Sequence, residues 1–323
     1  MATRGSGPVI TAQNLRKTFG SVQAVKDVSF DVEPGQVLGL LGPNGAGKTT
    51  TINMITTLLQ IDGGEATVGG FDVRTQPEVV RQLIGLAGQS AAVDEKLTAR
   101  ENLELFGRLY KIPRNERRRR IEKLIERFDL GAFADRPASS YSGGERRRLD
   151  VVAALVAEPP AVFLDEPTTG LDPRSRSELW NTVRSLASNG VAIVLSTQYL
   201  EEADRLADEI LVIDRGEIVA QGTPDALKHD LERDVLEVHV VDRTDVDTAR
   251  ELLGLDANVT TDVEARRIDI PVPGGADRSL DLLRQLQDGG VSISNFQLRQ
   301  PTLDDVFLAL TGSSVTETEE VTT

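Results

Sequence analysis

The sequence predicts an α/β protein with a mainly parallel sheet, followed by a small α+β domain. Three short apolar runs predict the sheet: residues 37–41 (VLGLL), 161–164 (AVFL) and 191–195 (VAIVL). Such continuous runs are typical of strands buried on both faces, and segments of helical character separate them. The chain has 323 residues, which is enough for two hydrophobic cores. We therefore expect a first domain at 1–225, a second at 226–311 and a disordered tail at 312–323.

The elements of the first domain follow from periodicity and turn residues. Residues 9–35 are expected to form short antiparallel strands, because apolar and polar residues alternate around Phe30 and a Glu-Pro-Gly turn follows. A helix is expected from Thr49, where apolar residues recur on one helical face. The charged segment 97–129 is also expected to be helical, with its apolar residues on one side. Residues 210–220 are interpreted as a hairpin around an Asp-Arg-Gly turn.

The second domain begins after the sequence Gly-Thr-Pro at 222–224. Residues 235–311 are expected to form strand, helix, strand, helix, strand and helix in that order. This alternation predicts a small α+β domain, for which a ferredoxin-like arrangement is the candidate.

Composition excludes several classes of protein. The chain contains no cysteine, so disulfides and cysteine metal sites are excluded. No apolar run approaches the roughly 20 residues that cross a bilayer, and the N-terminus lacks the apolar core of a signal peptide. Membrane work would therefore require another chain to do the spanning. The formal net charge is −15, which argues against nucleic acid as a partner. We expect the arginine clusters at 117–120 and 146–148 to be solvated helix faces.

The strongest motif is a phosphate-binding loop at residues 42–49. It reads Gly42, Pro43, Asn44, Gly45, Ala46, Gly47, Lys48 and Thr49, directly after a strand and directly before a helix. Glycines let backbone N–H groups turn inward around an anion, and the helix start adds its free N–H groups and its dipole. Lys48 supplies a cation for the outer phosphates, and the Thr49 hydroxyl can ligate Mg²⁺. The next residue, Thr50, belongs to the same candidate site.

Two carboxylates follow the strand at 161–164, namely Asp165 and Glu166. In open α/β sheets, the carboxyl ends of the strands form the ligand-binding edge, so these residues are expected beside the phosphate loop. Asp165 is the candidate for holding Mg²⁺ through water. Glu166 is the candidate for orienting or deprotonating the attacking water. Alone, such a pair often starts a solvent-exposed turn. The phosphate loop upstream makes a role in nucleotide binding the better interpretation.

Between these motifs lies the sequence YSGGERRR at 141–148. With it, the chain resembles the ATP-binding subunit of an ABC transporter over residues 9–225. The resemblance implies ATP and Mg²⁺ as cofactors and assigns further site residues. It implies that Phe19 stacks on adenine, that Gln89 joins the metal site to the transmembrane partner, that Ser142, Gly143 and Gly144 form the signature, and that Asp172 lies in the loop that crosses the dimer interface.

A narrower resemblance includes the second domain. The segments GQSAAVDEKLTARENLELFGRLY, YSGGERRRLD, DEPTTGLDPRSR, STQYLEEAD and PTLDDVFLALTG resemble the daunorubicin/doxorubicin resistance ATP-binding subunits. This implies a motor for export, peripheral at the cytoplasmic face of the membrane, and coupled to a separate transmembrane permease subunit through the groove around Gln89 and residues 90–112. The implied cargo is anthracycline-type drugs or other amphipathic compounds, with lipids or polyketides as the alternative.

The sequence also indicates a second copy of the chain. Ser142 and the two glycines after it precede a helical segment and form another anion-binding helix start, although an ordinary helix cap would look the same. One nucleotide is not easily held by both ends of one subunit. Two copies arranged head to tail solve the problem, with Lys48 of one facing Ser142 of the other across ATP.

Three positions depart from the general family. Tyr141 replaces a leucine but keeps the apolar bulk, and Glu145 replaces a glutamine and is expected to point away from the phosphates. Gln198 follows the strand at 191–195, where most ABC ATPases place a histidine that contacts the γ-phosphate. An amide can donate a hydrogen bond to phosphate but cannot titrate near neutral pH. Gln198 is therefore a candidate γ-phosphate sensor, and a helix-cap residue is the alternative.

Two other functions would fit a nucleotide-binding chain less well. A soluble ABC ATPase acting on ribosomes or nucleic acid usually carries two nucleotide domains or a long coiled-coil insertion, and neither is present here. A non-catalytic nucleotide sensor or drug-binding protein would not need Glu166. ATP hydrolysis coupled to transport is the function that the sequence favours.

Overall fold

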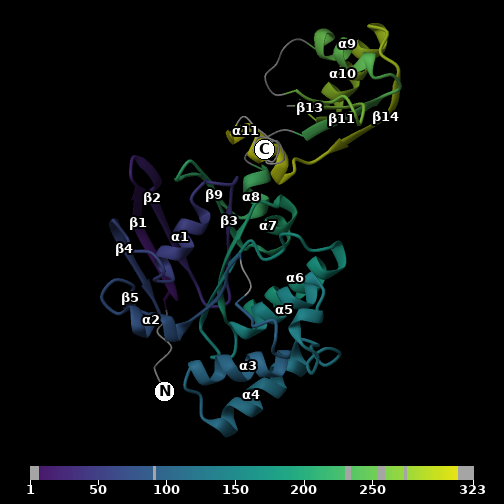
Figure 1. The fold of residues 1–323 in the computed structure, drawn as a ribbon. Coiled ribbons are helices and arrows are strands. Elements are labelled where there is room, and N and C mark those ends of the chain that lie inside the picture. The colour runs from purple at the N-terminus through teal and green to yellow at the C-terminus, as the bar shows by residue number, and fades with distance from the viewer. Residues whose placement is uncertain (1–6, 90–91, 230–233, 254–258, 273–274, 312–323) are drawn as a thin grey trace. The chain divides into compact units, whose positions relative to one another are not determined.

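The structure is a computed structural model that describes residues 7–89, 92–229, 234–253, 259–272 and 275–311. It divides into two compact units between Pro224 and Asp225. Figure 1 shows the order of the elements in each unit. The tail expected at 312–323 lies outside the described residues.

The first unit is built on a ten-stranded sheet with the order β5-β4-β1-β2-β10-β9-β3-β8-β7-β6. Its strands are β1 (Ile10–Phe19), β2 (Val22–Val32), β3 (Val37–Leu41), β4 (Gly63–Val68), β5 (Phe71–Asp72), β6 (Ile84–Ala87), β7 (Ala161–Asp165), β8 (Ala192–Thr197), β9 (Glu209–Asp214) and β10 (Glu217–Gly222). The neighbours β9, β3, β8, β7 and β6 run parallel, and β1, β2, β4 and β5 pair antiparallel. The predicted mainly parallel core and the antiparallel N-terminal strands are therefore confirmed.

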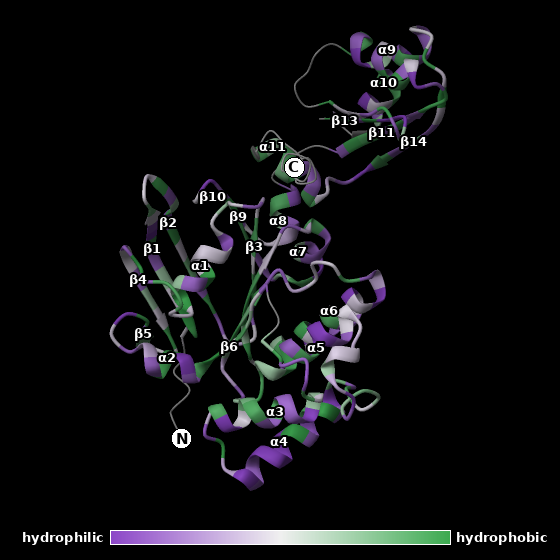
Figure 2. Cartoon of the chain, viewed as in Figure 1, coloured by the Kyte–Doolittle hydropathy of each residue, from purple (hydrophilic) through white to green (hydrophobic). Residues whose placement is uncertain are grey.

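The helices of this unit follow the strands along the chain. They are α1 (Lys48–Ile55), α2 (Pro77–Leu83), α3 (Ala99–Leu109), α4 (Arg114–Arg127), the short 3₁₀ helix η1 (Ala138–Ser140), α5 (Gly143–Ala153), α6 (Pro173–Ala187) and α7 (Leu200–Leu206). The charged segment 97–129 forms α3 and α4, as expected. On α4, Ile121 and Ile125 are buried while most of its charged residues face outward, as the hydropathy colouring in Figure 2 shows.

The parallel strands are buried on both faces, which explains their continuous apolar sequence. Every residue of β3, β7 and β8 is buried. Alternate residues of β7 face different layers, so Phe163 packs with Ile52 of α1 on one side and Val162 packs with Val183 of α6 on the other. The sheet therefore lies between two helical layers, and its strands carry polar residues out only at their ends.

The second unit holds a four-stranded antiparallel sheet with the order β12-β13-β11-β14. Its elements are β11 (Asp234–Val240), α9 (Thr244–Leu252), β12 (Thr260–Asp262), β13 (Arg267–Val272), α10 (Gly275–Asp288), β14 (Ile293–Arg299) and α11 (Leu303–Thr311), and α8 (Pro224–His229) joins it to the first unit along the chain. The order β-α-β-β-α-β with this strand arrangement is ferredoxin-like, as expected. The three-residue strand β12 was not predicted.

Candidate active site

The phosphate-binding loop connects the end of β3 to the start of α1, as the sequence predicts. Gly47 has a φ of 109° and sits at the N-cap of α1. A Cβ atom there would lie 2.5 Å from the carbonyl oxygen of Ala24 in β2. Both the backbone angle and the close approach therefore require glycine. The first N–H groups of α1, in Lys48, Thr49 and Thr50, have no partner within the helix and are available to an anion.

Lys48 lies inside this loop and is only 4% exposed. Its Nζ donates hydrogen bonds to the carbonyl oxygens of Gly42 at 2.6 Å and Pro43 at 3.0 Å. The same Nζ is 3.6 Å from a carboxylate oxygen of Glu166. Burial lowers the pKa of Lys48, and the carboxylates of Glu166 and Asp165 oppose this shift only in part. The loop thus holds a cation whose desolvation strengthens its attraction to phosphate oxygens.

Thr49, Asp165 and Gln89 come together at the carboxyl ends of β3, β7 and β6. The Thr49 hydroxyl donates to Asp165 Oδ1 at 3.1 Å, and Gln89 Nε2 donates to Thr49 Oγ1 at 3.3 Å. Ser196 of β8 also donates to Asp165 Oδ1, at 2.5 Å, which fixes the buried carboxylate. A hydroxyl, an amide and a carboxylate are oxygen donors of the kind that hard cations prefer.

Glu166 follows directly and has a left-handed backbone, with a φ of 46°. Its N–H group donates to both the carbonyl and the hydroxyl oxygen of Ser196, at 3.1 and 3.0 Å. Its carboxylate accepts from the Thr169 hydroxyl at 3.4 Å and faces Lys48. A strained backbone held by the neighbouring strand is typical of residues that are positioned for chemistry.

Gln198 lies next to these carboxylates through the strand pairing of β7 and β8. Asp165 pairs with Ser196, and Gln198 comes two residues later, half-buried. The N-cap of α7 is Tyr199, and no side chain caps that helix. Within the described part of the chain, no hydrogen bond engages the Gln198 amide, so the amide remains available to a ligand.

The signature residues start α5, as expected. Ser142 is the N-cap, and it forms a capping box in which its hydroxyl accepts from the N–H group of Glu145 at 3.2 Å. The Glu145 carboxylate turns back to the Ser142 N–H group and pairs with Arg136 at 2.8 Å, so it is occupied within its own chain. Ser142 and Gly143 are exposed, and α5 lies apart from α1 (Figure 1).

The Asp172 carboxylate is engaged in hydrogen bonds at the start of α6. It is the N-cap of α6, and its carboxylate accepts from the N–H groups of Arg174 and Ser175 at 3.0 Å and from the Ser175 hydroxyl at 2.6 Å. Ser175 also lies against Gly144, since a Cβ atom on Gly144 would clash with the Ser175 side chain. The starts of α5 and α6 therefore form one continuous surface.

Phe19 ends β1 beside the phosphate loop. It pairs with Val22 across the hairpin, and Ala24 of the same strand touches Gly47. The ring is 48% exposed, and the ammonium of Lys17 lies 5.5 Å from its centre. An exposed ring at this place can stack on a planar base.

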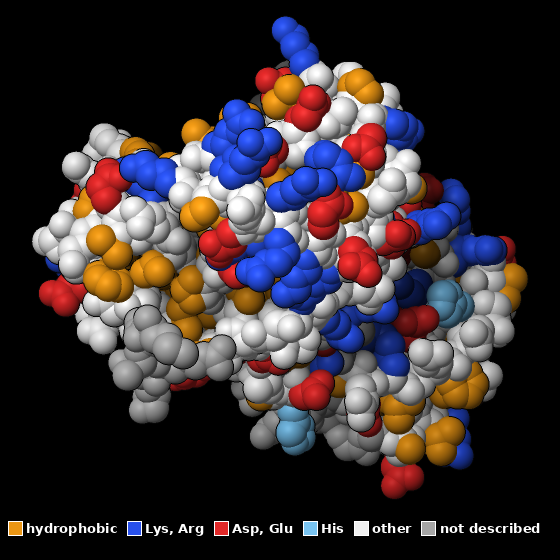
Figure 3. Space-filling view, turned by 90° about the horizontal axis from the view of Figure 1, so that it is seen from below, with side chains coloured by type: hydrophobic (Ala, Val, Ile, Leu, Met, Phe, Trp, Pro, Cys, Tyr) orange, Lys and Arg blue, Asp and Glu red, His pale blue; other side chains and the backbone are white. Residues whose placement is uncertain are grey.

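The arginine clusters at 117–120 and 146–148 are not solvated helix faces throughout, and this expectation is wrong for part of each. Figure 3, seen from the side of α3 and α4, shows lysine and arginine side chains with carboxylates between them. Arg118 and Arg119 are exposed as expected. Arg117 is only 9% exposed and makes two hydrogen bonds to Glu104, at 2.8 and 2.7 Å. A run of adjacent arginines conceals which of them faces inward.

Arg147 is the site residue that sequence reasoning missed. Its guanidinium donates to the carbonyl oxygens of Gly88 at 2.5 Å, Pro167 at 2.8 Å and Asp165 at 3.0 Å. It also pairs with Asp150 at 3.3 Å. Burial lowers the pKa of Arg147, and burial raises the pKa of Asp150. The signature helix is thus joined to both segments that carry candidate metal ligands.

No helix among the described residues is long and apolar enough to cross a bilayer. No group of three or more histidine, aspartate or glutamate side chains within the described ranges could hold a metal ion by itself. A cation at Thr49 and Asp165 would therefore need oxygen ligands from a bound phosphate or from water.

Two family models match the chain. The model described as ABC transporter matches residues 25–169, and the model described as ATP-binding protein DrrA1-3-like, C-terminal domain, matches residues 222–311. Both motifs for phosphate and metal fall within the first match. The second match falls on the ferredoxin-like unit.

Several relatives match nearly the whole chain. The daunorubicin resistance ATP-binding protein DrrA2 of Streptomyces coeruleorubidus is 47% identical over 97% of this chain and 98% of its own length. The doxorubicin resistance ATP-binding protein DrrA of Mycobacterium tuberculosis is 42% identical over 95% of each chain. The linearmycin resistance ATP-binding protein LnrL of Bacillus subtilis is 34% identical over 95% of this chain and 99% of its own.

Solved structures resemble the first unit. An ATP-binding subunit of an ABC transporter is 29% identical, with a TM-score of 0.62 over 69% of this chain and 92% of the other. A dimeric ATP-binding cassette in a post-hydrolysis state, bound to ADP and phosphate, is 25% identical, with a TM-score of 0.59 over 66% of this chain and 98% of the other. The chain is thus an ABC-type ATPase, and it belongs to the family of daunorubicin/doxorubicin resistance ATP-binding proteins.

Proposed function

We propose that this chain is the ATP-hydrolysing subunit of an exporter, that it works as a pair of identical copies and that it drives a separate membrane-spanning subunit. One observation carries the proposal. Lys48, Thr49 and Asp165 converge with Gln89 and Glu166 at one edge of the sheet, joined by hydrogen bonds and an ion pair. A cation, oxygen ligands for a metal ion and a carboxylate that can act on water are what phosphoryl transfer to water requires.

The phosphate chain of ATP is held by the loop and by the start of α1. Lys48 exchanges its bonds to the loop carbonyls for bonds to phosphate oxygens, and the N–H groups of Thr49 and Thr50 point at the same anion. The exposed ring of Phe19 holds the adenine by stacking. With these contacts, we expect the terminal phosphate near the carboxyl ends of β7 and β8.

A magnesium ion fits the oxygens of Thr49 and Asp165, with Gln89 beside them. When bound, Mg²⁺ supplies positive charge next to the phosphate oxygens. Asp165 is held in place by Ser196, and Thr49 is held by Gln89, so both ligands are fixed before the ion arrives. This pre-organisation lowers the reorganisation that binding requires.

Glu166 acts on the attacking water, and Gln198 acts on the γ-phosphate. Glu166 orients the attacking water and accepts its proton, because its carboxylate lies 3.6 Å from the Lys48 ammonium and is not among the proposed metal ligands. Gln198 donates its amide N–H to a γ-phosphate oxygen. Because an amide carries no charge, its stabilisation of the developing charge is weaker than that of a protonated histidine.

Two copies are needed to complete each site. The exposed start of α5 at Ser142 lies away from the phosphate loop of its own chain, and it presents free N–H groups to an anion. A solved relative of the first unit is dimeric, which supports the same arrangement here. Hydrolysis removes the γ-phosphate that joins the copies, and the pair separates.

The membrane-spanning partner is proposed to dock beside Gln89 on the surface of α3. Leu105 and Leu109 of this helix are 40% and 67% exposed, although they are large and apolar. A partner that contacts both α3 and Gln89 would couple its own movement to the metal ligands. This places the chain at the cytoplasmic face of a membrane, held by another subunit.

The cargo is proposed to be a drug or another amphipathic compound. The relatives' names include daunorubicin, doxorubicin and linearmycin resistance, and one relative at 38% identity is a Nod factor export ATP-binding protein. Export of a lipid or polyketide is the second candidate, since the same type of subunit bears these different names. The permease, rather than the ATPase, is expected to select the cargo.

The proposal is tested by Lys48→Ala in the host cell and in the purified chain. We expect nucleotide binding, ATP hydrolysis and daunorubicin efflux to be lost together, with the protein level unchanged. If the purified chain hydrolyses ATP but removal of its gene leaves daunorubicin efflux unchanged, the chain is an ATPase that does not export this drug. Efflux that persists in the Lys48→Ala strain would contradict the coupling.

A further inference from the structure

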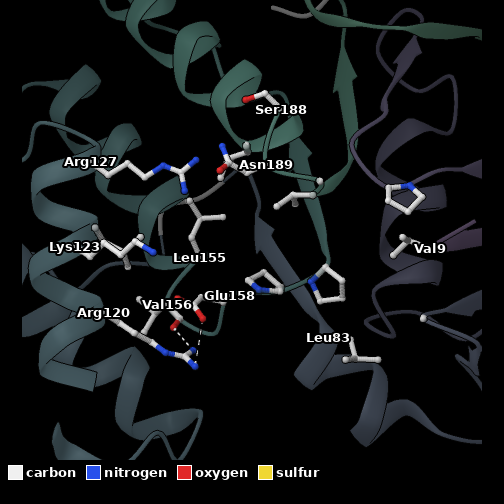
Figure 4. Close-up of a pocket in the computed structure, with 18 of the residues that line it drawn as sticks. Val9, Leu83, Arg120, Lys123, Arg127, Leu155, Val156, Glu158, Ser188 and Asn189 are labelled. Atoms are coloured by element: carbon white, nitrogen blue, oxygen red, sulfur yellow. Dashed lines mark hydrogen bonds and ion pairs between the residues drawn. The ribbon is translucent and has the colours of Figure 1, made fainter. Parts of the chain in front are cut away.

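A cavity of about 1140 Å³ lies at the edge of the sheet opposite the candidate active site. It is lined by Pro34 before β3, Pro159 and Pro160 before β7, and the turn 188–191 before β8. These are the amino ends of the same strands whose carboxyl ends carry the nucleotide residues. The cavity therefore cannot be part of the nucleotide site. Figure 4 shows it between α4 and the turns that lead into the sheet.

Apolar side chains form part of the wall and floor of this cavity. They include Leu124 of α4, Phe128 at the C-cap of α4, Leu155 after α5, and the prolines 159 and 160, with Val9, Phe71 and Leu83 on the other side. Apolar surface of this kind favours a ligand with a hydrocarbon chain or ring, because binding removes apolar surface of both the ligand and the cavity from water. A purely polar ligand would leave these walls without a partner.

One wall also carries three cations from α4. Arg120, Lys123 and Arg127 line the cavity, and Glu158 is the one carboxylate among the lining residues. The lining thus has an excess of two positive charges, in a chain whose formal net charge is −15. Against the acidic balance of the whole chain, this excess favours an anionic ligand.

The three cations are not equally available. Arg120 is committed, because it pairs with Glu116 at 2.5 Å and with Glu158 at 3.4 Å. Arg127 uses one nitrogen for the carbonyl and hydroxyl oxygens of Ser185, at 3.0 and 3.1 Å, and keeps its other N–H groups.

Lys123 forms no ion pair with any described acidic residue. It is exposed and lies one helical turn before Arg127, so both side chains reach the same space (Figure 4). The available positive charge is therefore concentrated at these two residues, at one side of the apolar walls.

We propose that this cavity binds an amphipathic anion, whose carboxylate or phosphate group lies between Lys123 and Arg127 and whose apolar body packs on Leu155 and the two prolines. The anionic group gains two charge-assisted contacts, and the body removes apolar surface from water. Such an anion could be a free amphiphile or the headgroup region of an acidic lipid. The chemistry is the same in both cases.

The test uses the purified full chain and n-octyl phosphate as the probe, with calorimetry as the readout. We expect one molecule to bind per chain. Inorganic phosphate, which lacks the body, and n-octyl glucoside, which lacks the charge, should each bind at least tenfold more weakly. Equal binding of n-octyl glucoside and n-octyl phosphate would overturn the proposal, as would an absence of n-octyl phosphate binding.

Lys123→Glu is the informative variant, because Lys123 has no ion pair to lose and the fold should remain intact. It should weaken n-octyl phosphate binding at least tenfold. Arg119→Glu is the matched control, since Arg119 is an exposed cation on the same helix but does not line the cavity. Binding of MgATP should be unchanged in both variants, because the nucleotide site is at the other edge. An equal loss in the two variants would show general charge attraction and overturn the proposed site.

The two sources of anion are distinguished with vesicles. Flotation with phosphatidylglycerol vesicles, and not with phosphatidylcholine vesicles, that is lost in Lys123→Glu but kept in Arg119→Glu supports an acidic lipid as the ligand. Binding of n-octyl phosphate without such flotation supports a free amphiphile.

Discussion

Arg147 donates a hydrogen bond to the backbone carbonyl oxygen of Asp165, 3.0 Å away. The same guanidinium reaches the carbonyl of Gly88, the residue before Gln89. One side chain of α5 thus holds the segments of two candidate metal ligands at a fixed separation. Since Ser142 is the N-cap of α5, this one helix joins the signature to the segments of both candidate metal ligands.

We expect Arg147→Gln to raise the Mg²⁺ concentration needed for half-maximal ATPase activity several-fold. The shorter amide cannot reach three carbonyl oxygens, and it leaves Asp150 buried without its cation. Loss of a partner from a buried polar group costs about 1–3 kcal/mol, so the free energy of unfolding should fall by a similar amount. A Mg²⁺ titration of activity and a denaturant titration measure the two effects.

Arg118→Gln is the control for this variant, because Arg118 is an exposed arginine of α4, and α4 carries no residue of the candidate active site. It should change neither quantity. If Arg147→Gln lowers stability but leaves the Mg²⁺ dependence unchanged, Arg147 is a structural residue only.

Glu166→Gln is expected to lower the rate of ATP hydrolysis about 10²–10⁴-fold, as for the loss of a general base. The amide has nearly the same shape as the carboxylate, so the affinity for MgATP should be retained. Single-turnover hydrolysis and equilibrium nucleotide binding separate the two. Hydrolysis at the normal rate would show that another group activates the water.

The same variant should also stabilise the proposed pair of copies, because bound ATP is no longer cleaved. Sedimentation with MgATP should show a larger species in Glu166→Gln than in the wild-type chain. A monomer under these conditions would contradict the arrangement in which Ser142 of one copy faces Lys48 of the other.

Gln198→Ala is expected to lower ATPase activity at least tenfold, since the side chain is half-buried beside Asp165 and does not cap α7. Gln198→His should be tolerated. Because a histidine titrates near pH 6.5 and an amide does not, activity of the histidine variant should gain a pH-dependent step in that range. Steady-state rates between pH 5.5 and 8.5 measure this, and near-normal turnover of Gln198→Ala would leave the residue with no catalytic role.

Much of the fold was predictable because its signals are local. The strands β3, β7 and β8 contain the continuous apolar runs 37–41, 161–164 and 192–195, since every residue in these strands is buried. The strand β12 was not predicted, because its three residues, Thr-Thr-Asp, carry no apolar pattern. The order of strands in the sheet also depends on contacts between distant segments, which periodicity does not report.

The site was predictable where backbone geometry demands particular residues. Gly47 is required by its φ of 109° and by the carbonyl of Ala24, so the loop motif is visible in the sequence. Arg147 was not predictable, because three successive arginines look alike and only the packing of α5 decides which is buried. Glu202 was equally concealed, since it belongs to an acidic run and yet is fully buried.

Glu202 leads to a prediction about pH. Its carboxylate accepts a hydrogen bond from Trp180 Nε1 at 2.9 Å, and burial raises its pKa above the ordinary value. The folded state therefore binds the proton more tightly than the unfolded state. Stability that this group contributes is fully present below the unfolded-state pKa, near 4.5, and is lost as pH rises toward the folded-state pKa.

Glu202→Gln keeps an oxygen for Trp180 but carries no charge. Its free energy of unfolding should therefore depend less on pH above about 4.5, and it should exceed that of the wild-type chain at neutral pH. Each unit of pKa difference corresponds to about 1.4 kcal/mol. Denaturant titrations of both proteins at pH 5 and pH 8 measure the effect, and parallel losses of stability in the two would mean that another group causes the pH dependence.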